Sequence, residues 1–391
     1  MTYDFDTTLI RRGTDCVKYD GLQHFFGIDD VIPMWVADMD FKTPDFIIDA
    51  VKKRCQHEVF GYPMPGISYI SAVKHWLKHY YKITAATEEL HFIPGIVAGI
   101  SYVVQAFSQP GDKILVTTPV YPPFVQIPTT SQRQLNPSKL LIKDGRFCID
   151  FDDFEAKAKE SRLFILSNPH NPGGTVWSVD DLRQMAAICA RYNVLVIADE
   201  IHADLTLPPA SHASFATVSD EAKQIAITFI APSKTFNMAG LGSSVSYTAN
   251  ADIRKTFHSY LDNYGVANGN IFAYVAAEAA FRFGESWLEQ MLQYLKGNVE
   301  TTRDFLASQM PKVKPILPEA SYLVWLDFAD YGLTHEETGR RLLYDAKVAL
   351  NDGTTFGGEN YKNCYRLNIG CPRAMLLEAL EKIAKAFNDV K

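Results

Sequence analysis

The chain has 391 residues, of which 47% are hydrophobic, and a formal net charge of −7 at pH 7. This length predicts about two domains with sizeable cores, and the acidic balance argues against a nucleic-acid partner, which would favour a basic surface. The six cysteines form no CxxC pair and no metal-ligand spacing, so we expect reduced cysteines and no metal. With no signal-peptide pattern and no apolar run of membrane-span length, the sequence predicts a soluble, cytoplasmic protein without a membrane partner.

The elements expected along the chain divide it into two parts. The first 45 residues contain proline breakers and predict an irregular segment. Strand and helix patterns alternate from about residue 92 to about residue 261, which predicts an α/β fold with a mostly parallel sheet flanked by helices. We therefore expect a large domain over residues 46–285 and a smaller α+β domain formed by residues 286–391 with the N-terminal segment 1–45. Hydrophobic periodicity and breakers predict further helices at 45–57, 68–81, 286–310, 334–346 and from 372, and strands at 313–316, 322–326, 348–350 and 364–369.

Four special segments each follow a short apolar run that reads as a buried strand. Tyr121 follows residues 114–116, Asn171 follows 163–166, Asp199 follows 194–198, and Lys234 follows 225–230. In an open α/β sheet, ligands bind outside the carboxyl ends of the strands. The sequence therefore predicts one crevice that holds an aromatic ring, an amide, a carboxylate and an amine.

Lys234 and Asp199 suggest the chemistry of this crevice. A desolvated lysine loses its charge readily and can form Schiff bases, although most lysines are surface groups. A carboxylate at the end of an apolar strand is costly unless it meets a cation, and Asp199 alone could equally be a helix N-cap or half of an ion pair. Together the two residues favour the pairing of an acid with the protonated ring nitrogen of pyridoxal phosphate.

Three further segments could complete a binding site. The turn around Asn171 is explained by its proline and glycine neighbours, which leaves the amide free to point at a ligand. Residues 94–100 predict a turn that opens a helix, whose free N–H groups would suit a phosphate, and the Ser233 hydroxyl could add to them. Arg366 interrupts an apolar strand; it is either a surface arginine on an edge strand or a two-pronged ligand for a substrate carboxylate.

These residues, in this order, match a known family. The set Tyr121, Asn171-Pro172-Gly173-Gly174, Asp199-Glu200, Ser233-Lys234 and Arg366 resembles the fold type I pyridoxal-phosphate enzymes, the aspartate aminotransferase superfamily, over most of the chain. Within that superfamily, residues 34–41, 199–202 and 368–373 look like the MalY/PatB cystathionine β-lyase (C–S lyase) branch. The resemblance implies pyridoxal 5′-phosphate as the cofactor and a homodimer with shared active sites.

The resemblance also assigns roles to single residues. Lys234 would bind the cofactor covalently, Asp199 would pair with the pyridine nitrogen, and Tyr121 would stack on the ring. Asn171 and His202 would bond the ring oxygen, although His202 could instead be a packing histidine. The remaining implied contacts are Val97, Ala98 and Ser233 to the phosphate, Tyr62 to the phosphate of the neighbouring subunit, and Arg366, Tyr121 and Asp38 to the substrate.

Two positions depart from the pattern of the family. Residue 231 is alanine where many relatives place a phosphate-binding serine, and residue 242 is glycine where aminotransferases commonly carry a phosphate-binding arginine. We therefore expect the phosphate to depend on backbone amides, Ser233 and the partner subunit.

The activity implied by the resemblance is a carbon–sulfur β-lyase of sulfur amino acid metabolism. Such an enzyme would cleave cystathionine or cysteine by α,β-elimination to pyruvate, ammonia and a thiol (homocysteine from cystathionine), with Lys234 as the general base at Cα. The same cofactor groups would also suit an aminotransferase. An alternative of another class, also implied by the resemblance, is a regulatory protein that binds a transcription activator.

Overall fold

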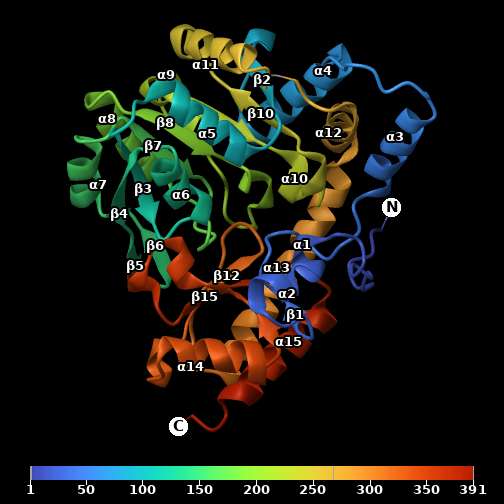
Figure 1. Cartoon of the computed structure of the whole chain (residues 1–391), viewed down its shortest axis with the longest axis vertical. Helices are drawn as coiled ribbons and strands as arrows, with labels where there is room; N and C mark the ends of the chain where they lie inside the picture. Colours follow the sequence, from blue (N-terminus) through green and yellow to red (C-terminus); the bar gives the residue numbers. More distant parts are fainter. Residues whose placement is uncertain (1, 267, 391) are drawn as a thin grey trace.

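The computed structural model describes residues 2–266 and 268–390. Its largest sheet consists of β2 (Leu90–Ile93), β3 (Lys113–Thr118), β4 (Gln134–Lys139), β7 (Leu163–Ser167), β8 (Leu195–Asp199), β9 (Ala226–Ile230) and β10 (Ser244–Tyr247). The order across the sheet is β2-β10-β9-β8-β7-β3-β4. Neighbours from β4 to β9 pair in parallel, and β10 is antiparallel to both β9 and β2. The prediction of a mostly parallel sheet is confirmed (Figure 1).

Helices cover both faces of this sheet, which is why its central strands are apolar at nearly every position. Side chains such as Ile165 and Ile197 pack on one face with α5 (Ile96–Phe107), α6 (Pro122–Thr130) and α11 (Ala251–Asn263). The alternate residues, such as Phe164 and Val196, pack on the other face with α7 (Phe151–Ala158) and α8 (Val179–Arg191). Smaller elements complete this part: α3 (Asp45–Cys55), α9 (Asp220–Gln224), α12 (Ile271–Phe283), and the hairpin β5 (Leu141–Lys143) and β6 (Arg146–Cys148).

A second, smaller sheet lies in the C-terminal part of the chain. It has four antiparallel strands in the order β11-β12-β15-β14, namely β11 (Lys314–Ile316), β12 (Leu323–Asp327), β15 (Cys364–Asn368) and β14 (Asn351–Asp352). The long helix α13 (Glu285–Gln309) contacts α15 (Arg373–Phe387) beside it. These elements agree with the expected helix at 286–310 and with the expected strand at 364–369.

Two predicted helices differ from the structure in the same way. The helix expected at 68–81 is α4 (Ile67–Trp76) followed by a π-helical turn at Leu77–Tyr81. The helix expected at 334–346 is α14 (His335–Arg340) followed by a π-helical turn at Arg341–Asp345. A π turn changes the hydrogen-bond spacing by one residue without altering which side chains are apolar, so hydrophobic periodicity does not reveal it.

The N-terminal segment lies against the C-terminal part of the chain (Figure 1). After α1 (Val17–Asp20) and α2 (Leu22–Phe26), strand β1 (Ile32–Pro33) pairs in parallel with β13 (Val348–Ala349). This pairing supports the expected association of residues 1–45 with the smaller domain, and the domain boundaries themselves stay a prediction. Within the described residues, no helix is both long enough and apolar enough to cross a membrane.

Candidate functional site

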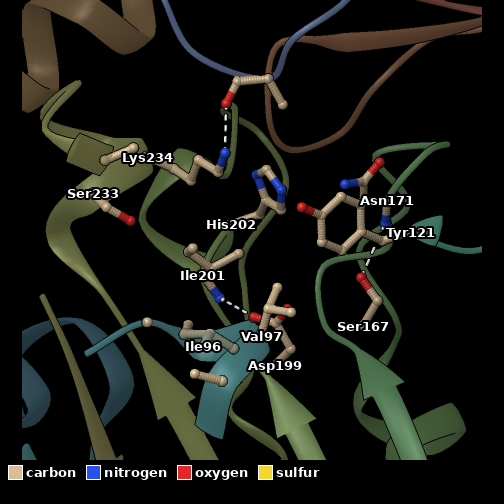
Figure 2. Close-up of a pocket in the computed structure, with 14 residues that line it drawn as sticks. Ile96, Val97, Tyr121, Ser167, Asn171, Asp199, Ile201, His202, Ser233 and Lys234 are labelled. Carbon is tan, nitrogen blue, oxygen red and sulfur yellow. Dashed lines mark hydrogen bonds between the residues drawn. The ribbon is translucent and has the colours of Figure 1, made fainter. Parts of the chain in front are cut away.

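A cavity of about 210 Å³ lies where the parallel strands of the large sheet end. Asp199 is the last residue of β8, and Lys234 lies in the short helix α10 (Pro232–Thr235) that follows β9. The structure brings most of the predicted site residues to this cavity, and Figure 2 shows several of them converging from different loops. The predicted residues that line the cavity are Val97, Ala98, Tyr121, Asn171, Asp199, His202, Ser233 and Lys234.

The Lys234 amine faces the cavity and loses its proton more readily than an ordinary lysine amine. Its Nζ donates a hydrogen bond to the Ala37 carbonyl over 2.6 Å (Figure 2). Burial and the nearby Arg366 cation lower the pKa of Lys234 to about 8, against the opposing carboxylates of Asp38 and Asp199. An amine with this pKa is available as a nucleophile and as a proton acceptor close to neutral pH, as the sequence predicts for Lys234.

The Asp199 carboxylate is buried, with 7% of the residue exposed. One oxygen accepts a hydrogen bond from the Ile201 N–H at 3.0 Å. Burial raises the pKa of Asp199 to about 7, and the Ile201 bond and the Lys234 charge only partly oppose this. The ionised form of a buried acid is unfavourable by itself and is stabilised when a cation binds beside it. This property fits the protonated ring nitrogen of pyridoxal phosphate.

Arg366 lies in β15, between β12 and β14, and only 3% of it is exposed. The alternative of a surface arginine on an edge strand is therefore wrong. One guanidinium nitrogen donates to Asn171 Oδ1 at 3.1 Å, and the other donates to Trp35 O at 2.9 Å and Asn351 Oδ1 at 2.6 Å. Burial lowers the pKa of Arg366 to about 10, so it remains a cation. Its buried Nε has no partner among the described residues, which leaves a donor for an anionic ligand such as a carboxylate.

Tyr121 and His202 supply uncharged groups to the cavity. Burial and the Lys234 and Arg366 cations lower the pKa of His202 to about 3, so its ring is neutral. Its Nδ1 is buried and bonds no other described atom, which leaves a hydrogen-bonding position for a ligand. Burial raises the pKa of the Tyr121 phenol. Both rings can therefore contact a cofactor without adding a charge.

The first turn of α5 provides a place for an anion. Val97 and Ala98 line the cavity beside Gly95 and Ile96, and the first N–H groups of a helix have no carbonyl partner within it. Ser233 lines the same cavity. Gly242 has φ +57°, and a Cβ there would lie 2.9 Å from the Pro94 carbonyl oxygen. The backbone at residue 242 thus favours glycine, and no arginine side chain is available there for a phosphate.

Comparison with known proteins identifies the family in which this arrangement of residues occurs. The family model of class I and II aminotransferases matches residues 29–383. The chain is 41% identical to the cystathionine β-lyase PatB of Bacillus subtilis, covering 98% of this chain and all of that protein. It is 31% identical to the protein MalY of Escherichia coli over the full length of both. The solved structure of the PLP-bound C–S lyase from Staphylococcus hominis superposes with a TM-score of 0.91 at 33% identity, covering 99% of this chain and 98% of that one.

The chain belongs to the class I and II aminotransferase family. Within it, the similarity to PatB and MalY places the chain in the branch expected from residues 34–41, 199–202 and 368–373. Three features of the cavity fit the pyridoxal phosphate that the family implies. They are the unbonded Nε of Arg366, the buried acid Asp199 with no cation bonded to it, and the lowered pKa of Lys234.

Three predicted site residues of this family member do not line the cavity: Arg366, which reaches it through its bond to Asn171, and Tyr62 and Asp38. Tyr62 is fully exposed in a loop. The Asp38 carboxylate bonds both terminal nitrogens of Arg11, at 3.0 and 2.6 Å, and reaches Lys234 only through its charge. The predicted contacts of Tyr62 with a neighbouring phosphate and of Asp38 with a substrate stay predictions.

Sequence reasoning missed several residues of the site. Ser167 ends β7, and its hydroxyl accepts the Asn171 N–H at 3.1 Å, which fixes the turn that carries the amide. A polar residue at the end of an apolar run was a usable signal for Ser167. The Tyr322 hydroxyl donates to the Ala37 carbonyl at 3.1 Å; no local pattern marks Tyr322, whereas Ala37 lies in the segment 34–41 that the resemblance singles out.

Proposed function

We propose that this protein is a pyridoxal-phosphate-dependent carbon–sulfur lyase that cleaves the Cβ–S bond of cystathionine or of a similar sulfur amino acid. The cofactor proposal rests on the meeting of Lys234, Asp199, Asn171 and Tyr121 in one cavity. The choice of a lyase is supported by the full-length similarity to a cystathionine β-lyase, PatB. The proposal also includes the preferred substrate, cystathionine or a similar amino acid, and the products of its cleavage.

Each group of the cavity has a role in this reaction. When bound, pyridoxal phosphate supplies an electron-accepting ring that stabilises negative charge at Cα of an amino acid. Asp199 would pair with the protonated pyridine nitrogen, whose positive charge would offset the cost of the buried carboxylate. Asn171 and His202 would bond the ring oxygen, and Tyr121 would cover the ring. The first turn of α5 and Ser233 hold the phosphate.

Arg366 and Lys234 act on the substrate. The Arg366 guanidinium binds the substrate carboxylate through its free Nε and a terminal nitrogen, which fixes the orientation of Cα. The Lys234 amine would hold the cofactor, and as a free amine it would accept the Cα proton as a general base. Departure of the Cβ thiolate then yields pyruvate and ammonia after hydrolysis, and the thiol from cystathionine is homocysteine.

An assay separates this reaction from amino transfer. Holoenzyme is mixed with cystathionine, and pyruvate is followed by coupled reduction, with and without an added keto acid. A lyase releases pyruvate and homocysteine with no keto acid present. Turnover that demands a keto acid and releases no pyruvate from cystathionine would replace the lyase by an aminotransferase.

We further propose that two copies form a homodimer through the loop that precedes α4. This loop, residues 57–66, leaves four large apolar or aromatic side chains exposed, namely Val59, Phe60, Tyr62 and Met64, although one edge of the Phe60 ring packs against Phe272. An exposed cluster of this kind marks an interaction surface. In the dimer, Tyr62 from this loop would reach the phosphate bound by the other copy. Phe60→Glu should yield monomers in sedimentation, and a dimer that persists in Phe60→Glu would contradict the assignment of this loop.

We also propose that the protein is located in the cytoplasm. The alternative of a protein that binds a transcription activator is not favoured by any feature of the described chain. A Lys234→Ala protein would separate protein binding from catalysis if such a partner were found.

A further inference from the structure

Four charged side chains gather where the N-terminal segment meets the loop over the cavity. The Arg11 guanidinium bonds Asp38 at 2.6 and 3.0 Å and Asp40 at 2.7 Å. The Lys18 amine bonds Asp40 at 2.6 Å, and the Tyr19 hydroxyl donates to Asp40 at 3.0 Å. Two cations and two anions thus form one network of zero net charge, and no predicted role in the reaction accounts for the two cations.

The network has a buried half and a partly exposed half. The side chains of Lys18 and Asp40 are 0% and 3% exposed, whereas those of Arg11 and Asp38 are 18% and 20% exposed. A buried ion pair that loses one partner is strongly destabilising, so Lys18 and Asp40 serve folding. Loss of Arg11 leaves Asp40 paired with Lys18 at 2.6 Å and leaves Asp38 only a longer contact with the same amine, at 3.5 Å. Arg11 is therefore the member whose replacement the fold can tolerate.

One carboxylate of this network, that of Asp38, belongs to the residue directly after the carbonyl that receives the Lys234 amine. Ala37 precedes Asp38 in the chain, and its carbonyl accepts both Lys234 Nζ at 2.6 Å and the Tyr322 hydroxyl at 3.1 Å. Arg11 also donates to the Met39 carbonyl at 3.2 Å. The Arg11 guanidinium thus bonds the side chain of residue 38 and the backbone of residue 39. These two residues directly follow Ala37, whose carbonyl faces Lys234.

The segment has other anchors besides Arg11, including a bond from the Lys18 amine to the Asp38 carbonyl at 3.3 Å. The Asn368 amide donates to the carbonyls of Val36 and Asp38 at 2.6 and 2.7 Å, and the Asn237 amide donates to Met39 at 2.8 Å. These bonds hold the backbone on its inner side. From the N-terminal segment, Arg11 bonds both carboxylates, and its planar fork fixes an orientation that a single-point contact cannot.

We propose that Arg11 is a positioning residue of the active site, which holds residues 37–39 so that the Ala37 carbonyl receives the Lys234 amine whenever that amine is not bound to the cofactor. The proposal rests on the proposed function only in taking Lys234 as the reactive amine. Because Arg11 acts through the loop, its effect should appear in the proton affinity of Lys234 even without a substrate.

The direction of the effect follows from the groups that face Lys234. These are Asp38, Asp199, Arg366 and the neutral His202. Without Arg11, a cation is removed, and the Asp38 carboxylate keeps only the more distant Lys18 amine, at 3.5 Å, as an ion-pair partner. Each change favours the charged form of the amine. The pKa of Lys234 should therefore rise, and less free amine should exist at pH 7.5.

The test compares Arg11→Gln with Arg12→Gln in the full-length protein freed of cofactor. Arg12 is the matched control, since it is the next residue and bonds only the Asp29 carbonyl among the contacts described for it. Trace acetylation at a series of pH values, read by mass spectrometry against the exposed Lys52, reports the free amine of Lys234. We expect labelling of Lys234 at pH 7.5 to fall about three- to tenfold in Arg11→Gln. It should be unchanged in Arg12→Gln and intermediate in Arg11→Lys, which keeps the charge but not the fork.

The outcomes are decisive in each case. Labelling of Arg11→Gln within twofold of the parent overturns the proposal. If Arg11→Gln does not fold, Arg11→Lys decides alone, and a pH profile identical to that of the parent overturns the proposal. A failed lyase assay with a changed labelling profile would refute the proposed reaction and leave the role of Arg11 standing, so the two failures are distinguishable.

Discussion

Asp199→Asn should make the cofactor-free protein more stable while it removes activity. The carboxylate is buried and its pKa is raised from the usual 3.8 to about 7. Each pKa unit corresponds to about 1.4 kcal/mol, so the ionised carboxylate costs the folded protein about 4 kcal/mol at pH 8. Asparagine carries no charge and can still accept the Ile201 N–H through its side-chain oxygen. The substitution therefore removes the cost and keeps the bond.

The pH dependence of this effect has a definite sign. An acid whose pKa is raised on folding destabilises the folded state above its unfolded pKa, and the cost reaches its full size above the folded pKa. The difference between variant and parent should therefore be near zero at pH 4, grow up to about pH 7 and stay constant above it. For a chain of 391 residues, a gain of about 4 kcal/mol corresponds to a rise in Tm of about 5 °C.

The assay is a pair of melting curves at pH 4.5 and pH 8, each with and without pyridoxal phosphate. Asp180→Asn is the control, because the side chain of Asp180 is 93% exposed and its loss should change stability by less than about 0.5 kcal/mol. Added cofactor should stabilise the parent more than the variant, and the lyase rate of the variant should fall about 10²- to 10³-fold, as for other single electrostatic groups. A cofactor-free variant that melts at or below the parent at pH 8 would refute the reasoning.

Three further changes test the rest of the site. Lys234→Ala should leave no covalently retained cofactor after borohydride reduction, and retention on another lysine in mass spectra would show that the reactive amine is elsewhere. Arg366→Lys keeps the cation but loses the fork, so KM for the amino acid should rise at least tenfold in steady-state assays; an unaltered KM would assign Arg366 to structure alone. Gly174→Ala should lower the free energy of unfolding by at least about 2 kcal/mol in urea melts, because its φ is +65° and a Cβ would lie 2.4 Å from Pro318. Gly332→Ala has the same positive φ with open space around it, and an equal loss there would show that crowding is not the cause.

The strand ends were the part of the site that the sequence predicted well. Asp199 and Lys234 follow short apolar runs that favour buried strands, and the geometry of a parallel sheet then places their side chains at one edge. The predictions for Asp199, Asn171, Tyr121 and Lys234 needed only local patterns of this kind. The structure brings all four to one cavity.

The contacts that cross the chain were beyond local patterns. Asp38 was predicted to face the substrate, yet its carboxylate bonds Arg11, and Arg11 lies in a segment without regular periodicity. The Ala37 carbonyl meets a lysine 197 positions away. Such pairings depend on how the N-terminal segment packs onto the finished fold, and no spacing in the sequence records that packing. The π-helical turn at Leu77–Tyr81 was missed because it leaves the apolar stripe unchanged.

The pairing of β1 with β13 has a consequence for synthesis of the protein on the ribosome. Residues 32–33 find their partner strand only at residues 348–349, so the N-terminal segment leaves the ribosome more than 300 residues before the strand it pairs with. At about 5–20 residues per second, this segment waits roughly 15 to 60 seconds without its partner. Throughout that interval the buried residues Met34 and Trp35 lie open to chaperones and proteases. The active site is thus among the last parts of the nascent chain to form, and a truncated product that stops before residue 348 would lack the strand pairing that anchors the loop over Lys234.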